Sequence, residues 1–253
     1  MNMKNCRNLL LAAAVLVAAS SCSDKVQVKG TLAGAPDTQV VVKQLSGSTL
    51  VTLDTLKTDA SGAYSCKIDV LKGQPQFVYL FKGDTKIASL LLQKGDKVKV
   101  ASDTLGKYSV EGSEESERLR QVEEDFAAFM DKFAADAAAG DNAAASKDYI
   151  EYYRGCVKYI MTNSKSLTSI PVLYQKVNES FPIFSQATDA ILFQNVHDSL
   201  MTVYPESKYL EALKKEAEKR FNIFNLSQRV QNARESSYPD LNLPSVDGTK
   251  VKL

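Results

Sequence analysis

The chain has 253 residues, 31 of them basic and 30 acidic, which gives a formal net charge of +1 at pH 7. Because basic and acidic residues are nearly equal in number, the composition argues against nucleic acid as a partner and against membrane binding through a polybasic segment. The sequence has no tryptophan, and none of its four cysteines stands in Cys-x-x-Cys spacing. These 253 residues therefore do not contain the redox motif of a thioredoxin-type site.

Residues 1–21 have the pattern of a targeting segment. Lys4 and Arg7 form a basic start, and Leu9–Ala19 is an apolar run of about eleven residues. A run of this length is too short for a bilayer-spanning helix and is typical of a signal peptide. Its removal takes away two basic residues and leaves 29 basic against 30 acidic side chains, a net charge near −1.

The small residues Ala18-Ala19-Ser20-Ser21 directly before Cys22 resemble the lipobox of bacterial lipoproteins. The resemblance implies cleavage before Cys22, acylation of its thiol and attachment to a membrane of the cell envelope, facing the periplasm rather than the cell surface. Acyl chains anchor a protein through the burial of their CH₂ groups. The alternative is an ordinary signal peptide that is cleaved near Ser21 and leaves Cys22 as a free thiol.

Residues 25–112 alternate between apolar and polar side chains in short runs, with Gly- and Asp-containing turns at intervals of about ten residues. This pattern predicts a small antiparallel β-sandwich. The expected strands are Val26–Leu32, Gln39–Leu45, Thr49–Leu56, Ala63–Ile68, Gln76–Phe81, Ile87–Gln93, Lys97–Ala101 and Tyr108–Glu111. Their expected inward side chains are Val28, Val40, Val42, Leu53, Tyr64, Ile68, Val78, Leu80, Leu90, Val98 and Val100.

Residues 113–236 change to an apolar period of about 3.6, which predicts an α-helical domain of about five helices. Ser113 with acidic residues behind it forms an N-cap. The expected helices run from Ser113 to Gly140, from about Ser146 to Thr162, briefly from Pro171, from Ser185 to about Val203, and from Pro205 through Phe224. Their expected inward side chains are Leu119, Val122, Phe126, Phe129, Met130 and Phe133, then Ile150, Tyr153, Val157, Ile160 and Met161, then Ala190, Phe193, Val196 and Leu200, and last Tyr209, Leu213, Ala217, Phe221 and Phe224.

Residues 237–253 predict a β-hairpin that turns at Asp247-Gly248. A lone hairpin is marginal in water, so we expect this one to be poorly packed without a partner sheet. The fold class expected for the whole chain is α+β and multidomain: a sandwich, a helical unit and an orphan hairpin.

Several motifs, in their order, resemble one family of envelope lipoproteins. They are Val-x-Gly-x-Leu at 28–32, Asp-x-x-Gly-x-Tyr at 59–64, Leu-Gln-Lys-Gly-Asp-Lys-Val-x-Val at 92–100, Val-Glu-Gly-Ser at 110–113, Tyr-Pro-x-Ser-x-Tyr at 204–209 and the hairpin pattern at 239–253. The family joins a β-rich domain of unknown function and a helical segment to a TlpA-like (AhpC-TSA, thioredoxin-fold) thiol-disulfide oxidoreductase domain. The resemblance implies that 237–253 is the truncated start of that domain, and it assigns no catalytic residue to the chain.

The two cysteines that remain after Cys22 are Cys66 and Cys156. An oxidising envelope permits a disulfide between them, but they fall in different expected domains. Cys66 alternates with Tyr64 and Ile68 along one strand, which is typical of a buried small apolar residue. We therefore expect two separate thiols in preference to a bridge.

The remaining candidates for chemistry have simpler structural interpretations. His197 has no metal-ligand spacing around it, and neither a metal nor a cofactor is expected. The acidic residues at 114–125 are interleaved with Arg118 and Arg120, as on a solvated helix face. Four tyrosines on the second helix suit either helix packing or an interface; they are Tyr149, Tyr152, Tyr153 and Tyr159.

Two functions remain open. In the first, the chain is the non-catalytic anchoring and interaction portion of a thioredoxin-like oxidoreductase that serves redox homeostasis of the cell envelope. In the second, it is a complete non-enzymatic lipoprotein that binds an envelope partner through its sandwich or its helices. The partners expected are the bilayer, through Cys22, and envelope proteins. Whether the chain is an enzyme stays undecided.

Overall fold

The computed structural model of the protein describes residues 25–235, 242–244 and 250–252. The expected signal peptide, Cys22 and the Asp247-Gly248 turn lie outside the described residues. The eight strands of the N-terminal part are β1 (Lys25–Leu32), β2 (Gln39–Ser46), β3 (Thr49–Lys57), β4 (Ala63–Asp69), β5 (Gln76–Lys82), β6 (Thr85–Leu92), β7 (Lys97–Ser102) and β8 (Tyr108–Glu111).

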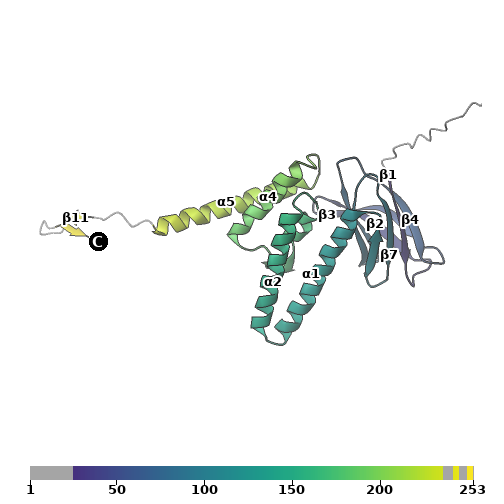
Figure 1. Ribbon diagram of the computed structural model, residues 1–253, viewed down its shortest axis with the longest axis horizontal. Helices are drawn as coiled ribbons and strands as arrows, with labels where there is room; N and C mark the ends of the chain where they lie inside the picture. Colours follow the sequence, from purple (N-terminus) through teal and green to yellow (C-terminus); the bar gives the residue numbers. More distant parts are fainter. Residues whose placement is uncertain (1–24, 236–241, 245–249, 253) are drawn as a thin grey trace, which may run out of the picture.

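These strands form two four-stranded sheets that enclose one apolar core (Figure 1). One sheet has the order β4-β1-β7-β8 and the other β3-β2-β5-β6. Alternation places Val26 and Val28 of β1 in the core, together with Val98 of β7 from the same sheet and Leu80 of β5 from the other. The α+β fold class with its sandwich is confirmed. All pairs in the two sheets are antiparallel except β1 and β7, which run parallel because the chain passes through the opposite sheet between them.

One inward prediction for the sandwich was wrong. Leu53 is 43% exposed, because β3 is an edge strand with only β2 beside it and nearly all its side chains in solvent. A register shift in β2 between Val42 and Lys43 also interrupts the β2–β3 ladder. The apolar alternation along β3 therefore does not indicate which of its side chains face the core.

Two of the sequence motifs meet inside the sandwich. Gly30 and Tyr64 are cross-strand partners, and a Cβ on Gly30 would lie 2.0 Å from Cζ of the Tyr64 ring. The tyrosine therefore fills the space that any larger residue at position 30 would occupy. Asp59 shapes the turn before Tyr64, because its carboxylate accepts hydrogen bonds from the backbone N–H groups of Ser61 (2.8 Å) and Ala63 (2.9 Å).

The helical part follows directly after β8. Its elements are α1 (Glu114–Ala138), α2 (Asn142–Thr162), α3 (Ser169–Leu173), β9 (Lys176–Asn178), β10 (Phe181–Pro182), the 3₁₀ helix η1 (Ala187–Asp189), α4 (Ala190–Met201) and α5 (Leu210–Glu235). Ser113 caps α1 as expected, and its Oγ accepts from the N–H of Ser116. The second helix begins four residues earlier than predicted, because Asp141 caps it through the N–H of Ala144.

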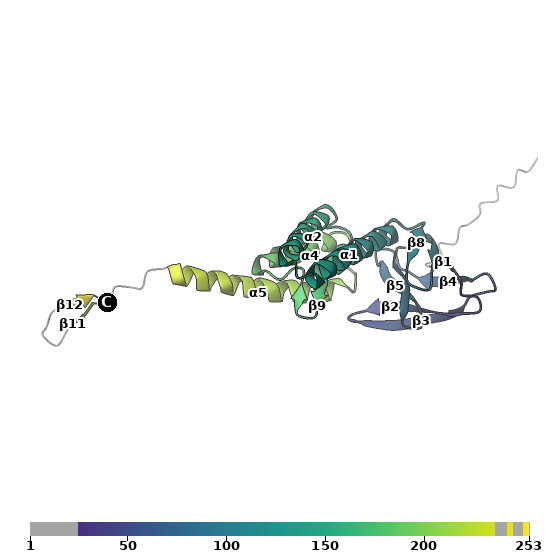
Figure 2. The ribbon, with the colours of Figure 1, turned by 90° about the horizontal axis from the view of Figure 1, so that it is seen from below.

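The inward predictions for the helices were right where a helix is covered and wrong where it is not. Ala190, Phe193, Val196 and Leu200 of α4 are fully buried. In α2, Ile160 is buried as predicted, but Ile150 and Met161 are 47% and 64% exposed, because the buried stripe of this helix runs through Asp148, Cys156 and Ile160. In α5, Phe221 is exposed because this helix runs past the body of the protein, as Figures 1 and 2 show.

α1 and the segment that leads into α5 pack against the outer surface of the β3-β2-β5-β6 sheet. Phe77 of β5 and Leu91 of β6 belong to the helical core and not to the sandwich core. Every side chain of β6 from Ile87 to Leu92 is buried, because β6 has the sandwich core on one face and α1 on the other. The helical part lies beside the sandwich in Figure 2, and α1 joins the two.

A polar cluster with donors from both sheets fixes α1 on the sandwich. The Glu123 carboxylate accepts hydrogen bonds from Lys86 Nζ (2.6 Å), Ser89 Oγ (2.7 Å) and Tyr108 Oη (3.1 Å). Ser116 adds a second attachment, since its Oγ accepts from the N–H of Leu91 and donates to the Leu91 carbonyl, both at 3.1 Å.

The expected C-terminal hairpin is present as two short strands, β11 (Asn242–Pro244) and β12 (Lys250–Lys252), which pair antiparallel with each other. In Figures 1 and 2 they lie beyond the end of α5. The side chains of these two strands lie outside the described part of the structure, so the expectation of poor packing stays a prediction.

Candidate functional site

An apolar pocket lies where the sandwich meets the helices. Its volume is about 630 Å³, and its lining comes from the turn after β2, from β5, from α3 and from the start of α5. Apolar and aromatic side chains dominate, as in ligand sites generally. They are Leu45, Phe77, Tyr79, Ile170, Pro171, Tyr174, Tyr209, Ala212 and Leu213.

Tyr209 forms the inner corner of this pocket. Its hydroxyl accepts from the backbone N–H of Phe77 (2.9 Å) and donates to the carbonyl of Leu45 (3.3 Å). The β2–β5 ladder ends one residue earlier, at Gln44 and Val78, so the hydroxyl takes the place of the next inter-strand hydrogen bonds. The ring also packs edge-on against Phe77, with centroids 5.0 Å apart. Burial raises the pKa of Tyr209 to about 12, which keeps the phenol protonated.

The segment Tyr204–Tyr209 attaches the start of α5 to the sandwich at more than one point. Besides the Tyr209 contacts, the Glu206 carboxylate accepts from Gln74 Nε2 at 3.1 Å. Ser207 is buried, and its N–H donates to the Tyr204 carbonyl. The Tyr-Pro-x-Ser-x-Tyr motif is therefore a docking loop that shapes one wall of the pocket.

The charges of the pocket lie on the α5 side. Glu211 and Lys215 form an ion pair at 2.7 Å on its rim. Lys208 lies over the Tyr209 ring, 5.4 Å from its centroid, and among the described residues no carboxylate is within ion-pair distance of it. Burial lowers the pKa of Lys208, because partial desolvation disfavours an ammonium group. The pocket thus combines an apolar wall with one uncompensated cation.

The sandwich resembles a described protein domain. A family model described as a domain of unknown function (DUF4369) matches residues 26–119. The match covers all eight sandwich strands and the first turn of α1 and ends before the rest of the helical part. No curated protein matches the chain. The sandwich is therefore similar to DUF4369, while α2 to α5 and the pocket wall they contribute lie outside the matched range.

The two cysteines of the described part are separate. Cys66 lies in the core of the DUF4369-like sandwich and Cys156 in the helical core, and both are free and buried. Burial raises the pKa of each thiol to about 11. Cys22, the predicted lipidation site, lies outside the described residues.

The four tyrosines of α2 all bond within the helical part. The hydroxyls of Tyr149 and Tyr153 donate to the Ile183 carbonyl (2.7 Å) and to Asp189 (2.6 Å). Tyr152 and Tyr159 are hydrogen-bonded to Gln175 (2.9 Å) and Thr168 (2.6 Å). This arrangement favours the packing interpretation over an interface.

The other candidates also have structural partners. His197 Nδ1 lies 2.9 Å from Asp198. The acidic face of α1 is paired along the helix, for example Arg118 with Glu114 at 2.6 Å. Nowhere in the described part do three or more His, Cys, Asp or Glu side chains gather as a metal site would require. Among the described helices, none has the length and apolar character to cross a membrane.

Sequence reasoning did not find the pocket. Its residues come from four elements between positions 45 and 215, and only the fold brings them together. The docking loop at 204–209 was the one visible signal, and without the structure it indicated only a helix start.

Proposed function

We propose that the chain is the anchored, non-catalytic N-terminal portion of a TlpA-like thiol-disulfide oxidoreductase of the cell envelope. Three observations support the proposal. The sandwich matches DUF4369, the docking loop of α5 carries the Tyr-Pro-x-Ser-x-Tyr pattern, and β11 and β12 pair antiparallel with each other, as a hairpin in this part of the chain requires. The order of these features along one chain carries the argument.

The chemistry of the thiols supports a non-catalytic role for the described part. Thiol-disulfide exchange requires an accessible thiolate. With a pKa of about 11, roughly one thiol in ten thousand is ionised at pH 7. Cys66 and Cys156 are also buried in different cores. In this proposal, exchange chemistry belongs to a thioredoxin-like domain and these residues hold that domain at the membrane.

The redox part of the proposal is tested by insulin reduction with dithiothreitol. We expect purified residues 23–253 to give only the background rate, and the Cys66→Ala/Cys156→Ala variant to behave identically. Turnover above background that survives in the double variant would refute the non-catalytic assignment.

The anchoring part is tested by metabolic labelling with a radioactive fatty acid. We expect label in the wild-type precursor and none in Cys22→Ser, while Cys66→Ser keeps the label and serves as the matched control. Equal labelling of wild type and Cys22→Ser would contradict acylation at this residue.

The pocket favours a second candidate function, partner binding by a non-enzymatic lipoprotein. An apolar concavity of about 630 Å³ has room for one or two large side chains of a partner. A photo-crosslinking amino acid at Ala212, which lines the pocket and is exposed, should then give a discrete envelope adduct. The same probe at Ala60, which is exposed and does not line this pocket, is the control; adducts of equal yield at both positions would count against the pocket.

A further inference from the structure

The outer surface of the β4-β1-β7-β8 sheet has a charge quite unlike that of the whole chain. We call its exposed side chains the lysine face; they are Lys25, Gln27, Lys29 and Thr31 of β1, Ser65, Lys67 and Asp69 of β4, Lys97, Lys99 and Ala101 of β7, and Ser109 and Glu111 of β8. Five lysines stand against two acids, a formal charge of +3. Because the charge of the whole chain is near zero, its composition does not reveal this basic face.

The positive charges of this face are only partly neutralised by acidic side chains. Lys29 and Lys99 are direct partners in the parallel β1–β7 ladder, and like charges in such positions are destabilising. Lys25 is paired with Asp69, at 3.8 Å. Within the described part of the chain, no carboxylate lies within ion-pair distance of Lys29, Lys67 or Lys97. An uncompensated cluster of this kind suits an external anion.

The same face is hollowed around Lys29 and Lys99. The depression measures about 780 Å³, and the hydroxyl residues Thr31, Ser65 and Ser109 line it beside the two lysines. Ammonium and hydroxyl groups are the donors that a phosphate group accepts from.

Two acids also border this depression. The Asp59 carboxylate accepts hydrogen bonds from the Ser61 hydroxyl and from the backbone N–H groups of Ala63 and Ser61. These bonds hold the pKa of Asp59 below its usual range. Glu111 lies opposite Lys99 in the β7–β8 ladder. The acids therefore reduce the positive charge of the face without reversing it.

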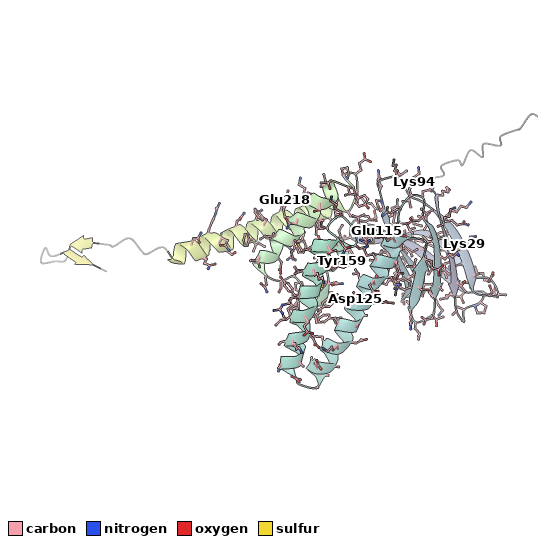
Figure 3. All side chains as sticks on the ribbon, viewed as in Figure 1. Lys29, Lys94, Glu115, Asp125, Tyr159 and Glu218 are labelled. Atoms are coloured by element: carbon pink, nitrogen blue, oxygen red, sulfur yellow. The ribbon has the colours of Figure 1, made fainter. Side chains whose placement is uncertain are left out.

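The lysine face begins close, along the chain, to the predicted membrane anchor at Cys22. β1 begins at Lys25, three residues after the predicted lipidation site, and three extended residues span only about 10 Å. That distance is close to the Debye length of about 8 Å at physiological salt. Figure 3 places Lys29 on the side of the sandwich away from the helices, so contact through this face leaves the helices and the junction pocket free.

We propose that the lysine face binds the phosphate headgroups of anionic phospholipids and so holds the sandwich flat on the bilayer. The inference rests on the proposed anchoring at Cys22. It adds an orientation: the β4-β1-β7-β8 sheet faces the lipid, and the helices and α5 point away from it. Each lysine near an anionic surface contributes roughly a fivefold gain in affinity.

The test uses residues 23–253 without the acyl group, so that its outcome is independent of whether Cys22 is lipidated. Co-sedimentation is measured with vesicles of 30% phosphatidylglycerol in phosphatidylcholine and with phosphatidylcholine alone, at low and physiological salt. The variant replaces Lys29, Lys67, Lys97 and Lys99 by Gln. The matched control replaces four exposed lysines of the helical part by Gln: Lys158, Lys165, Lys214 and Lys219.

We expect wild type to bind the anionic vesicles alone, less at physiological salt, and the face variant to bind at least tenfold more weakly. The helical control should stay within twofold of wild type. Circular dichroism melting checks that both variants fold. Absence of binding by wild type, or equal loss in both variants, would overturn the proposal. Saturable binding of inorganic phosphate at Lys29 and Lys99 without vesicle binding would also overturn it, because the ligand would then be a free anion.

Discussion

Removing the Tyr209 hydroxyl should weaken the junction between sandwich and helices. In Tyr209→Phe the ring keeps its edge-on contact with Phe77, but the Phe77 N–H and the Leu45 carbonyl lose their partner in a buried place. A buried donor left unsatisfied costs about 1–3 kcal/mol, and we expect a loss of unfolding free energy in that range. Tyr209→Ala, which also removes the buried ring, should cost about 3–5 kcal/mol.

The assay is urea unfolding of residues 23–253 followed by far-UV circular dichroism. Tyr174→Phe is the matched control, because Tyr174 lines the same pocket but is 44% exposed. Its loss should stay below about 0.5 kcal/mol, as is usual for surface substitutions. Suppose that Tyr209→Phe, like the Tyr174→Phe control, unfolded at the same urea midpoint as wild type. The interpretation that the Tyr209 hydroxyl replaces the next hydrogen bonds of the β2–β5 ladder would then be refuted.

Three further predictions concern the core contacts. Glu123→Gln should cost about 1.5–3 kcal/mol in the same urea assay, because charge-assisted hydrogen bonds from the sheet to α1 are lost; an unchanged midpoint would contradict the polar attachment. Gly30→Ala should cost about 1–3 kcal/mol of unfolding free energy by overpacking against the Tyr64 ring. In a Tyr64→Ala background the same substitution should cost little. Additive losses in the double variant would disprove the contact. Burial raises the thiol pKa values of Cys66 and Cys156 from 9.0 to about 11, so their stabilisation is complete below pH 9 and is lost as the pH rises towards 11. Over that range the wild type should lose roughly 2–4 kcal/mol more than a double Ala variant, and parallel pH profiles would show that the thiols are not buried.

Local patterns predicted the elements well where one face of an element is covered. The alternation of β1 and the stripe of α4 both report burial, and both predictions were confirmed. The same reasoning failed at Leu53 and at Met161, because an edge strand and the outer side of a helix hairpin have no layer above them. Whether an apolar position is covered depends on neighbours that are distant in sequence.

The candidate sites depend even more on tertiary structure. The turn glycine and aspartate before Tyr64 can be recognised in the sequence, but their relation to Gly30 requires the β1–β4 register. Likewise, the sequence does not show that Lys29 and Lys99 are neighbours, because only the parallel β1–β7 pairing places them side by side. The charge of the lysine face and the pocket at Tyr209 are properties of register and layer packing, which composition cannot express.

The most direct test of the proposed function is mass spectrometry of the native protein, captured from solubilised cell envelopes with an antibody raised against residues 25–235. We predict an N-terminal peptide that begins at an acylated Cys22, together with peptides of a thioredoxin-like domain that contains Trp-Cys-x-x-Cys in the same polypeptide. An unacylated N-terminus, or a polypeptide without such a domain, would contradict the account.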